Sequence, residues 1–128
     1  MNNNANINKK ILIFEDDKDY FFILQESFKR EGFTVIGAQN GEEGLLLIEK
    51  EKPDLILLDI MMPVMDGLQV AQKIKEKNIT TPVIFLTHLK DADSISKALE
   101  IIPSDYIIKS DMPIDKIIAE IKKKLGIS

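Results

Sequence analysis

Five short apolar runs of strand length, alternating with stretches of helical spacing, constrain the fold of this chain more than any other feature. Parallel strands need a long crossover between them, usually a helix, so such an alternation is typical of a parallel sheet with helices on both faces. We therefore predict an α/β fold built on one five-stranded parallel sheet. The predicted strands are Lys10–Phe14, Thr34–Ala38, Asp54–Leu58, Pro82–Leu86 and Tyr106–Ile108.

The stretches between and after these runs have the spacing of amphipathic helices. In the last one, Ile114, Ile118 and Ile121 fall on one side of a helix, and the charged residues fall on the other. Asp66, just before Gly67, is interpreted as a helix N-cap. The other predicted helices are Lys18–Glu31, Glu42–Lys52, Gly67–Lys77 and Ala92–Ile101.

Composition limits the classes of function. The chain has 128 residues, of which 45% are hydrophobic and 30% charged, as expected of one globular domain that buries its own core. Its net charge of −4 argues against binding nucleic-acid phosphates, and the lack of cysteine excludes disulfides and thiolate chemistry. We expect a disordered polar tail over residues 1–8 and one domain over residues 9–126. Because the start lacks the apolar core of a secretory signal, we expect a location in the cytoplasm.

Four of the predicted strands run directly into charged or hydroxyl side chains. Glu15 and Asp16 follow the first strand, Asp59 the third, Thr87 the fourth and Lys109 the fifth. Ligands of open α/β sheets bind beyond the carboxyl ends of the strands, so we expect these residues to share a site. Crowded carboxylates need a cation or a lysine between them, and an oxygen-only site suits Mg²⁺. In such surroundings Asp59 has the features of a carboxylate nucleophile for a phosphoryl group.

The motifs around these residues resemble the receiver domains of response regulators in two-component signal transduction. "LLDIMMPVMDG" contains Asp59 and is similar to the phosphorylation-site motif of that family. "FLT" ends in the family's hydroxyl residue, and "DYIIK" carries its aromatic residue and its lysine. The resemblance extends from Lys10 to Leu125. It implies a single-domain receiver of the chemotaxis type, with a flavodoxin-like doubly wound (βα)5 fold and strand order 2-1-3-4-5.

The resemblance assigns roles to the residues of this site. Asp59 is the implied phosphoacceptor, and the implied donor is the phosphohistidine of a sensor histidine kinase or histidine phosphotransfer protein. The implied ligands of Mg²⁺, for which Mn²⁺ or Ca²⁺ can substitute, are Asp16, Asp59, the backbone carbonyl of Met61 and, through water, Glu15. The chain would not be an enzyme for other substrates, since it would catalyse only its own phosphorylation and dephosphorylation.

A conformational switch is also implied. Lys109 would pair with one phosphoryl oxygen and Thr87 would move to hydrogen-bond another, which leaves space for Tyr106 to turn inward. The surface formed by the helix at Ala92–Ile101, the strand at Tyr106–Ile108 and the last helix would then take a second arrangement. A downstream effector protein would recognise that arrangement.

The first predicted helix carries two neighbouring phenylalanines. A helical wheel places Phe22 among polar residues and Phe21 at the margin of the two faces, so at least one large aromatic side chain should face water. In receiver domains this helix packs against the helices that bear the phosphohistidine, and we expect Phe21 and Phe22 to dock that partner. We expect no direct contact with nucleic acid or membrane, and a monomer or weak dimer.

Three departures from the family pattern are present, one of which is Ile102–Ser104 in place of the usual small Gly-Ala turn before the last strand. Two other functions also stay open. His88 stands where a small residue usually follows the hydroxyl, and Ser110 replaces a proline after the lysine. One alternative function is a Mg²⁺-dependent phosphohydrolase with an Asp nucleophile, which commonly has a second Asp where Met61 stands. The other is a flavodoxin-like cofactor binder, but the loop "EDDKD" would repel the phosphate that such a loop has to hold.

Overall fold

The structure is a computed structural model that describes residues 7–88 and 92–127, and it contains the predicted alternation of strands and helices. Residues 1–6, which make up most of the predicted tail, lie outside the described residues. None of the described helices has the length and apolar character needed to cross a membrane. The elements in chain order are β1 (Lys10–Phe14), α1 (Lys18–Arg30), β2 (Thr34–Ala38), α2 (Gly41–Glu51), β3 (Leu55–Asp59), α3 (Gly67–Glu76), β4 (Val83–Thr87), α4 (Ala92–Ile101), β5 (Asp105–Ile108), the 3-10 turn η1 (Lys109–Asp111) and α5 (Ile114–Lys124).

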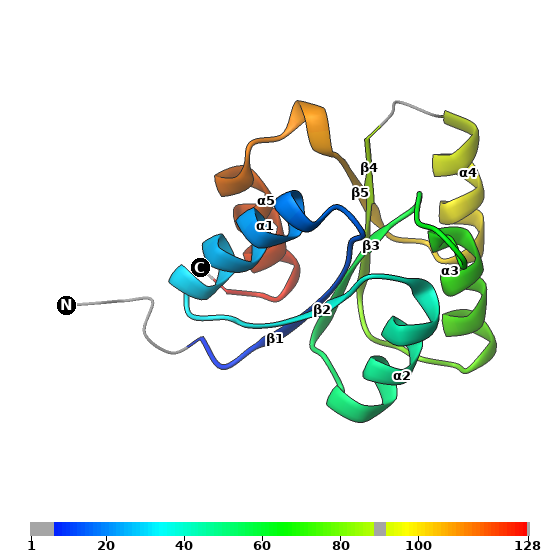
Figure 1. The fold of residues 1–128 in the computed structure, drawn as a ribbon, viewed down its shortest axis with the longest axis horizontal. Helices are drawn as coiled ribbons and strands as arrows, with labels where there is room; N and C mark the ends of the chain where they lie inside the picture. Colours follow the sequence, from blue (N-terminus) through cyan, green and yellow to red (C-terminus); the bar gives the residue numbers. More distant parts are fainter. Residues whose placement is uncertain (1–6, 89–91, 128) are drawn as a thin grey trace.

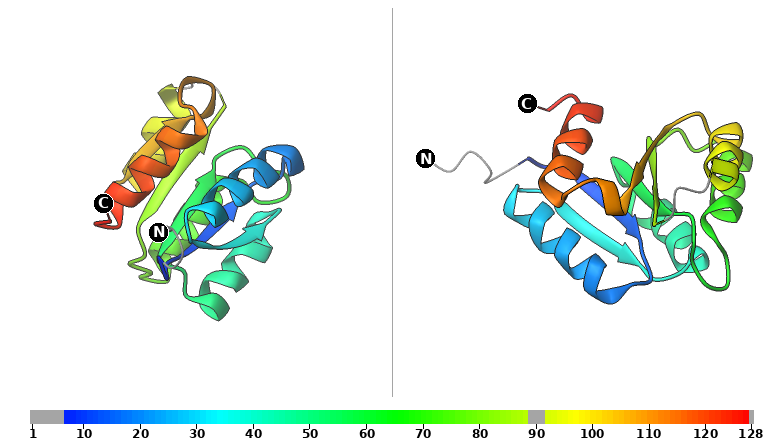
Figure 2. Two further views of the ribbon diagram at one scale, coloured as in Figure 1. Left: turned by 90° about the vertical axis from the view of Figure 1, so that its left-hand side faces the viewer. Right: turned by 90° about the horizontal axis from the view of Figure 1, so that it is seen from above.

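The strands pair in parallel in the order β2-β1-β3-β4-β5, which confirms the predicted topology (Figure 1). Helices α1 and α5 cover one face of the sheet and α2, α3 and α4 cover the other, as the views of Figure 2 show. Successive strand residues point to opposite faces. Leu12 and Phe14 pack toward α2, α3 and α4, whereas Ile11 and Ile13 pack toward α1 and α5. The sheet is therefore buried on both sides.

The third and fourth strands lie one residue further along the chain than predicted. Asp54 lies just before β3, and its Oδ2 accepts the backbone N–H of Lys10 at 2.8 Å. Pro82 has no N–H to donate to the sheet, and β4 begins after it. As a result Asp59 and Thr87 are the last residues of β3 and β4, not residues that follow them. Their backbones are thus held within the sheet.

Aspartate caps fix the first turns of two helices that border the carboxyl ends of the strands. Asp17 precedes α1, and its carboxylate accepts the backbone N–H groups of Asp19 and Tyr20 at 3.0 and 3.1 Å. Asp66 precedes α3 and forms a reciprocal capping box with Gln69, which confirms the predicted N-cap. Both helices therefore start at defined positions beside the predicted site.

Candidate functional site

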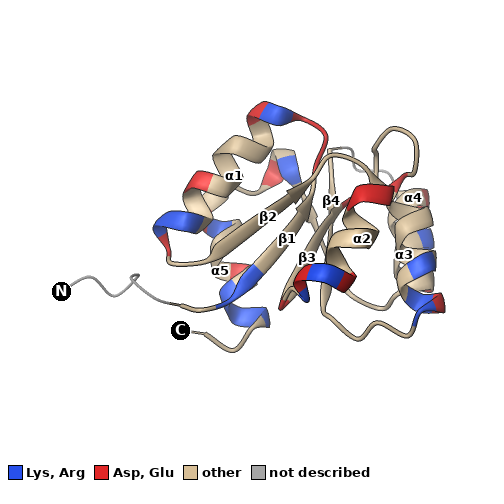
Figure 3. Cartoon of the chain, turned by 60° about the horizontal axis from the view of Figure 1, so that its bottom comes forward, with Lys and Arg blue, Asp and Glu red and all other residues tan. Residues whose placement is uncertain are grey.

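The parallel register brings four of the predicted site residues to one edge of the sheet. Among β1, β3, β4 and β5, the last residues of neighbouring strands are level to within one residue. Glu15, Asp59, Thr87 and Lys109 consequently lie where adjacent strands end. Figure 3 shows acidic segments at this edge, where β1 leads into α1 and where α2 begins. The site predicted from the strand ends is thus assembled by the fold.

The ammonium of Lys109 lies between two carboxylates. Its Nζ donates to Oδ2 of Asp59 at 3.0 Å and to Oε1 of Glu15, and all three side chains are almost completely buried. Two negative charges therefore share one positive charge away from bulk water. A cluster with such an excess of negative charge favours the binding of a further cation.

Asp59 is fixed through both carboxylate oxygens. Oδ1 accepts the backbone N–H of Met61 at 3.0 Å, and Oδ2 accepts Lys109. The start of α3 approaches the same strand end, because a Cβ on Gly67 would lie only 2.4 Å from the backbone oxygen of Asp59. Only glycine fits that approach without a movement of the backbone. The Asp59 carboxylate is held at the strand end, and the residue is 2% exposed.

Burial raises the pKa of both carboxylic acids that contact Lys109. For Asp59, the loss of water outweighs the ammonium of Lys109 and the N–H of Met61, which favour the ionised form. For Glu15, burial raises the pKa, and the negative charge of Asp59 acts in the same direction. Burial thus disfavours the ionised forms of Asp59 and Glu15, and a further cation at the site would stabilise them.

The residues at this edge fit a small divalent cation. Carboxylate oxygens of Glu15, Asp16 and Asp59 lie within 4.8 Å of one another, and Asp16 is exposed, so the cluster is open to solvent. Hard oxygen ligands with room for water molecules suit Mg²⁺. Met61 lies at the same edge, with its N–H bound to Asp59 and its side chain exposed. Its carbonyl stays a predicted ligand.

Tyr20 also borders the site, although its place in the sequence did not indicate this. Nζ of Lys109 lies 4.7 Å from the centroid of its ring. Burial, together with the negative charges of Glu15 and Asp59, raises the pKa of Tyr20 to about 12, so the phenol stays neutral at physiological pH. The available signal was an aromatic residue in the first turn after the acidic loop, but its contact with Lys109 depends on tertiary packing.

The two residues of the predicted switch differ in exposure. Thr87 ends β4 and is buried, whereas Tyr106 in β5 is 46% exposed. Tyr106 lines a shallow pocket of about 410 Å³ together with Ile95 and Leu99 of α4. Its ring therefore lies on the outer surface between α4 and β5. The inward movement of Tyr106 stays a prediction.

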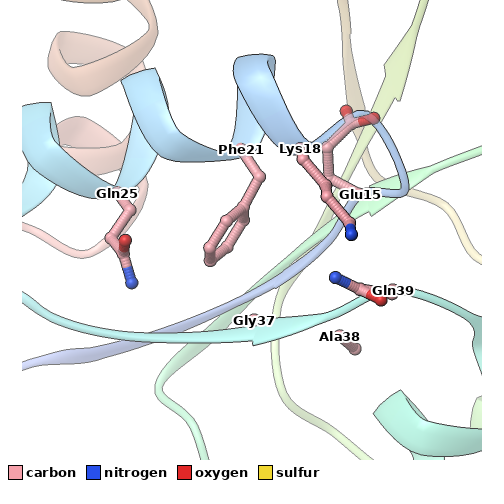
Figure 4. Close-up of a pocket in the computed structure, with 7 residues that line it drawn as sticks. All are labelled: Glu15, Lys18, Phe21, Gln25, Gly37, Ala38 and Gln39. Carbon is pink, nitrogen blue, oxygen red and sulfur yellow. The ribbon is translucent and has the colours of Figure 1, made fainter.

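The two phenylalanines of α1 have different surroundings. Phe22 is 60% exposed, which confirms that a large aromatic residue faces water. Phe21 is half-buried, and Figure 4 shows it pointing from α1 toward Gly37 in β2. A Cβ on Gly37 would lie 2.4 Å from the Phe21 ring, so the ring rests directly on the strand. Phe21 therefore packs in part against β2, and Phe22 is the more exposed of the two. The docking of a partner by these two residues stays a prediction.

Two of the departures from the family pattern, His88 and Ser110, lie just after β4 and β5. His88 follows β4 and has an exposed side chain. Ser110 lies within η1, and the described residues contain no cis peptide bond. Lys109 is the first residue of this 3-10 turn and directly follows Ile108, the last residue of β5.

Comparisons with known proteins agree with this geometry. A model of the response regulator receiver domain family matches residues 11–122. Sporulation initiation phosphotransferase F of Bacillus subtilis (strain 168) is 34% identical over 119 residues, which cover 93% of this chain and 95% of that protein. The alkaline phosphatase synthesis transcriptional regulatory protein PhoP of the same organism is 37% identical over 107 residues, covering 84% of this chain but 45% of that protein, so the chain spans less than half of that relative. The crystal structure of a two-component response regulator from Clostridium difficile matches with a TM-score of 0.85 at 32% identity, over 92% of this chain and 96% of that one.

Proposed function

Because the chain belongs to the response regulator receiver domain family and is a phosphoacceptor signalling domain, we propose that Asp59 is the residue that accepts the phosphoryl group. The observation that carries this proposal is the set of groups around its carboxylate. Asp59 lies buried at the end of β3, in contact with Lys109 and within reach of the same cation as Glu15 and Asp16. Phosphoryl transfer depends on positioning and on positive charge, and this edge of the sheet can supply both.

In the proposed reaction, one carboxylate oxygen of Asp59 attacks the phosphorus of a phosphohistidine. The new O–P bond forms as the P–N bond breaks, and the bonding electron pair stays with the imidazole nitrogen, which takes a proton from solvent. The products are an acyl phosphate on Asp59 and a free histidine on the donor. Asp59 has to be ionised to attack, so groups that favour its charged form assist the reaction.

Lys109 and the acidic pair would have separate tasks. Asp16 and Glu15, with Asp59, would hold Mg²⁺, which supplies positive charge to the phosphoryl oxygens when it is bound. The ammonium of Lys109 already lies 3.0 Å from Asp59 and would pair with another phosphoryl oxygen. Glu15 contacts the same ammonium and would keep it beside the phosphoacceptor.

The response to phosphorylation would be a rearrangement of α4, β5 and α5. Thr87 ends the strand next to β3, and Tyr106 lies on the outer surface of the following strand. A movement of Thr87 toward the phosphoryl group would give Tyr106 space to turn inward. The surface of α4, β5 and α5 would then differ between the two states, and a downstream effector protein could distinguish them.

The donor would be a sensor histidine kinase or a histidine phosphotransfer protein. A relative that aligns over nearly its full length is a phosphotransferase by name, which supports a role as a relay. Another relative is a transcriptional regulatory protein, of which this chain spans less than half. Either output, a relay or direct contact with an effector, would use the same chemistry at Asp59.

Intact-mass measurement after incubation with Mg²⁺ and acetyl phosphate tests the assignment. The wild-type protein should gain the mass of one phosphoryl group, and Asp59→Asn should not. Asp66→Asn is the matched control, because this acid caps α3 and asparagine is also a good N-cap, so that variant should still be phosphorylated. Gain of the same mass at another acid in Asp59→Asn would show that Asp59 is not the phosphoacceptor.

A further inference from the structure

Tyr20 and Lys109 come from opposite ends of the chain and meet beside the phosphoacceptor. Tyr20 lies in the first turn of α1, where its backbone N–H donates to Oδ1 of Asp17 at 3.1 Å. Lys109 directly follows β5. The distance of 4.7 Å between its Nζ and the centroid of the Tyr20 ring is within the range at which an aromatic face attracts an ammonium.

The ring supplies a third contact to the Lys109 ammonium. Two contacts are made by the carboxylates of Glu15 and Asp59. A lysine ammonium sits on a flexible four-carbon stem, so several contacts are needed to keep it in one position. A third carboxylate would also hold the ammonium, but it would add negative charge to a cluster that already has an excess. An aromatic ring attracts the ammonium without adding a formal charge.

The ring of Tyr20, and not its hydroxyl, makes the contact with Lys109. The hydroxyl oxygen is buried and has no hydrogen-bond partner within the described part of the chain. A buried hydroxyl without a partner lowers stability. The contact that distinguishes Tyr20 from an aliphatic residue at this position is therefore the one between its π face and Lys109.

We propose that Tyr20 is a positioning residue whose ring keeps the ammonium of Lys109 directed at Asp59, ready to pair with an incoming phosphoryl group. This inference rests on the proposed function of Asp59 and Lys109 and adds a residue of α1 to it. Tyr20 takes no part in the O–P bond, which forms between Asp59 and the phosphoryl group of the donor. The ring limits the positions that the ammonium can take.

Substitutions at Tyr20 separate the ring from the hydroxyl. Tyr20→Leu keeps an apolar side chain but removes the π face, and it should lower the rate constant of phosphorylation by acetyl phosphate at saturating donor by about tenfold. The donor concentration for half-maximal rate should stay nearly constant, because the lysine acts on the reacting group. Tyr20→Phe retains the ring and should restore the wild-type rate. Tyr20→Met provides the same test as Tyr20→Leu if that variant does not fold.

Phe33→Leu is the control for the destabilisation that follows from the loss of a packed aromatic ring. Phe33 is buried and packs edge to face on Phe28, with the ring centroids 5.4 Å apart. Its substitution should lower the free energy of unfolding and leave the rate constant of phosphorylation unchanged. A fall in rate in this control equal to that in Tyr20→Leu would mean that destabilisation alone explains the effect, and the inference would be wrong.

An NMR measurement tests the contact without phosphorylation. The ring current of Tyr20 should shift the signals of the Lys109 ε protons, and this shift should persist in Tyr20→Phe and vanish in Tyr20→Leu. A shift that survives in Tyr20→Leu, or a slow Tyr20→Phe variant, overturns the role of the ring. If the wild type is phosphorylated and Tyr20→Leu is phosphorylated at the same rate, this inference alone is wrong. A wild-type protein that gains no phosphoryl group at Asp59 overturns the proposed function as well.

Discussion

At the scale of single residues, Glu15 and Asp59 are the most completely buried acids among the described residues, and Lys109 balances only one of their two charges. Because burial raises the pKa of both acids, the folded state binds their protons more tightly than the unfolded state does. The stability contributed by this proton binding is complete below the ordinary pKa, 3.8 for Asp59. It is lost as the pH rises through the raised pKa.

Asp59→Asn should therefore stabilise the protein at neutral pH in the absence of Mg²⁺, because an amide carries no charge to bury. The gain in the free energy of unfolding over wild type should be largest near pH ~7 and should shrink as the pH falls toward about 4. Urea unfolding with EDTA at a series of pH values measures it. Glu26→Gln, at an exposed position of α1, is the control and should show no comparable trend. A lower free energy of unfolding for Asp59→Asn than for wild type at neutral pH would contradict this prediction.

Among the elements, α1 contributes to the site in two ways. Its inner side packs Leu24 and Phe28 into the core and brings Tyr20 to Lys109. Its outer side leaves Phe22 and Ile23 exposed. Because α1 begins directly after the acidic loop, a helix docked on its outer side could carry a phosphohistidine to Asp59. Exposed aromatic residues at such a position are typical anchors of protein interfaces.

Phe22→Ala should slow phosphoryl transfer from the cognate phosphohistidine protein by about tenfold, the effect of losing an anchor worth about 1.4 kcal/mol. Its effect on the free energy of unfolding should stay within about 0.5 kcal/mol, because the side chain is mostly exposed. Quenched time courses with the radiolabelled donor measure the transfer rate, and urea unfolding measures the stability. Leu46→Ala is the control, since Leu46 is also mostly exposed but lies on α2, at the other face of the sheet. Equal transfer rates for both variants and wild type would exclude Phe22 as an anchor.

At the scale of the whole molecule, the carboxylates proposed to bind Mg²⁺ are brought together only by folding. Glu15 and Asp16 come from the loop after β1, and Asp59 comes from the end of β3. The unfolded chain does not hold these carboxylates together, so a cation that binds them stabilises the folded state. The increase in stability on adding the cation therefore measures binding at this site without any phosphoryl donor.

Mg²⁺ at a hundred times its dissociation constant should raise the free energy of unfolding by about 2.7 kcal/mol. Asp16→Asn should lose most of this gain, and Lys109→Ala should keep it, because the lysine is not a metal ligand. Urea unfolding with and without MgCl2, at ionic strength matched with NaCl, measures the difference, and EDTA should reverse it. An undiminished gain in Asp16→Asn would mean that Mg²⁺ binds elsewhere.

Local patterns in the sequence determined the order of the elements and most of the site. Hydrophobic periodicity reports which side of each segment is buried, so it predicted the strands and helices to within a few residues. The carboxyl ends of parallel strands meet at one edge, so Asp59, Thr87 and Lys109 could be placed together from their positions alone. The family motif supplied the strand order. Hydrophobic periodicity is a local property of the chain, and the motif is a property that the family shares.

Only the tertiary structure decided which side chains touch. It places the Lys109 ammonium between Glu15 and Asp59, and the ring of Tyr20 against it. It also places the Phe21 ring on β2, so that Phe22 is the more exposed of the pair. These contacts join segments that are distant in the chain, and they depend on how α1 packs across the sheet. Periodicity records that a residue is buried, but it does not record the partner against which the residue is buried.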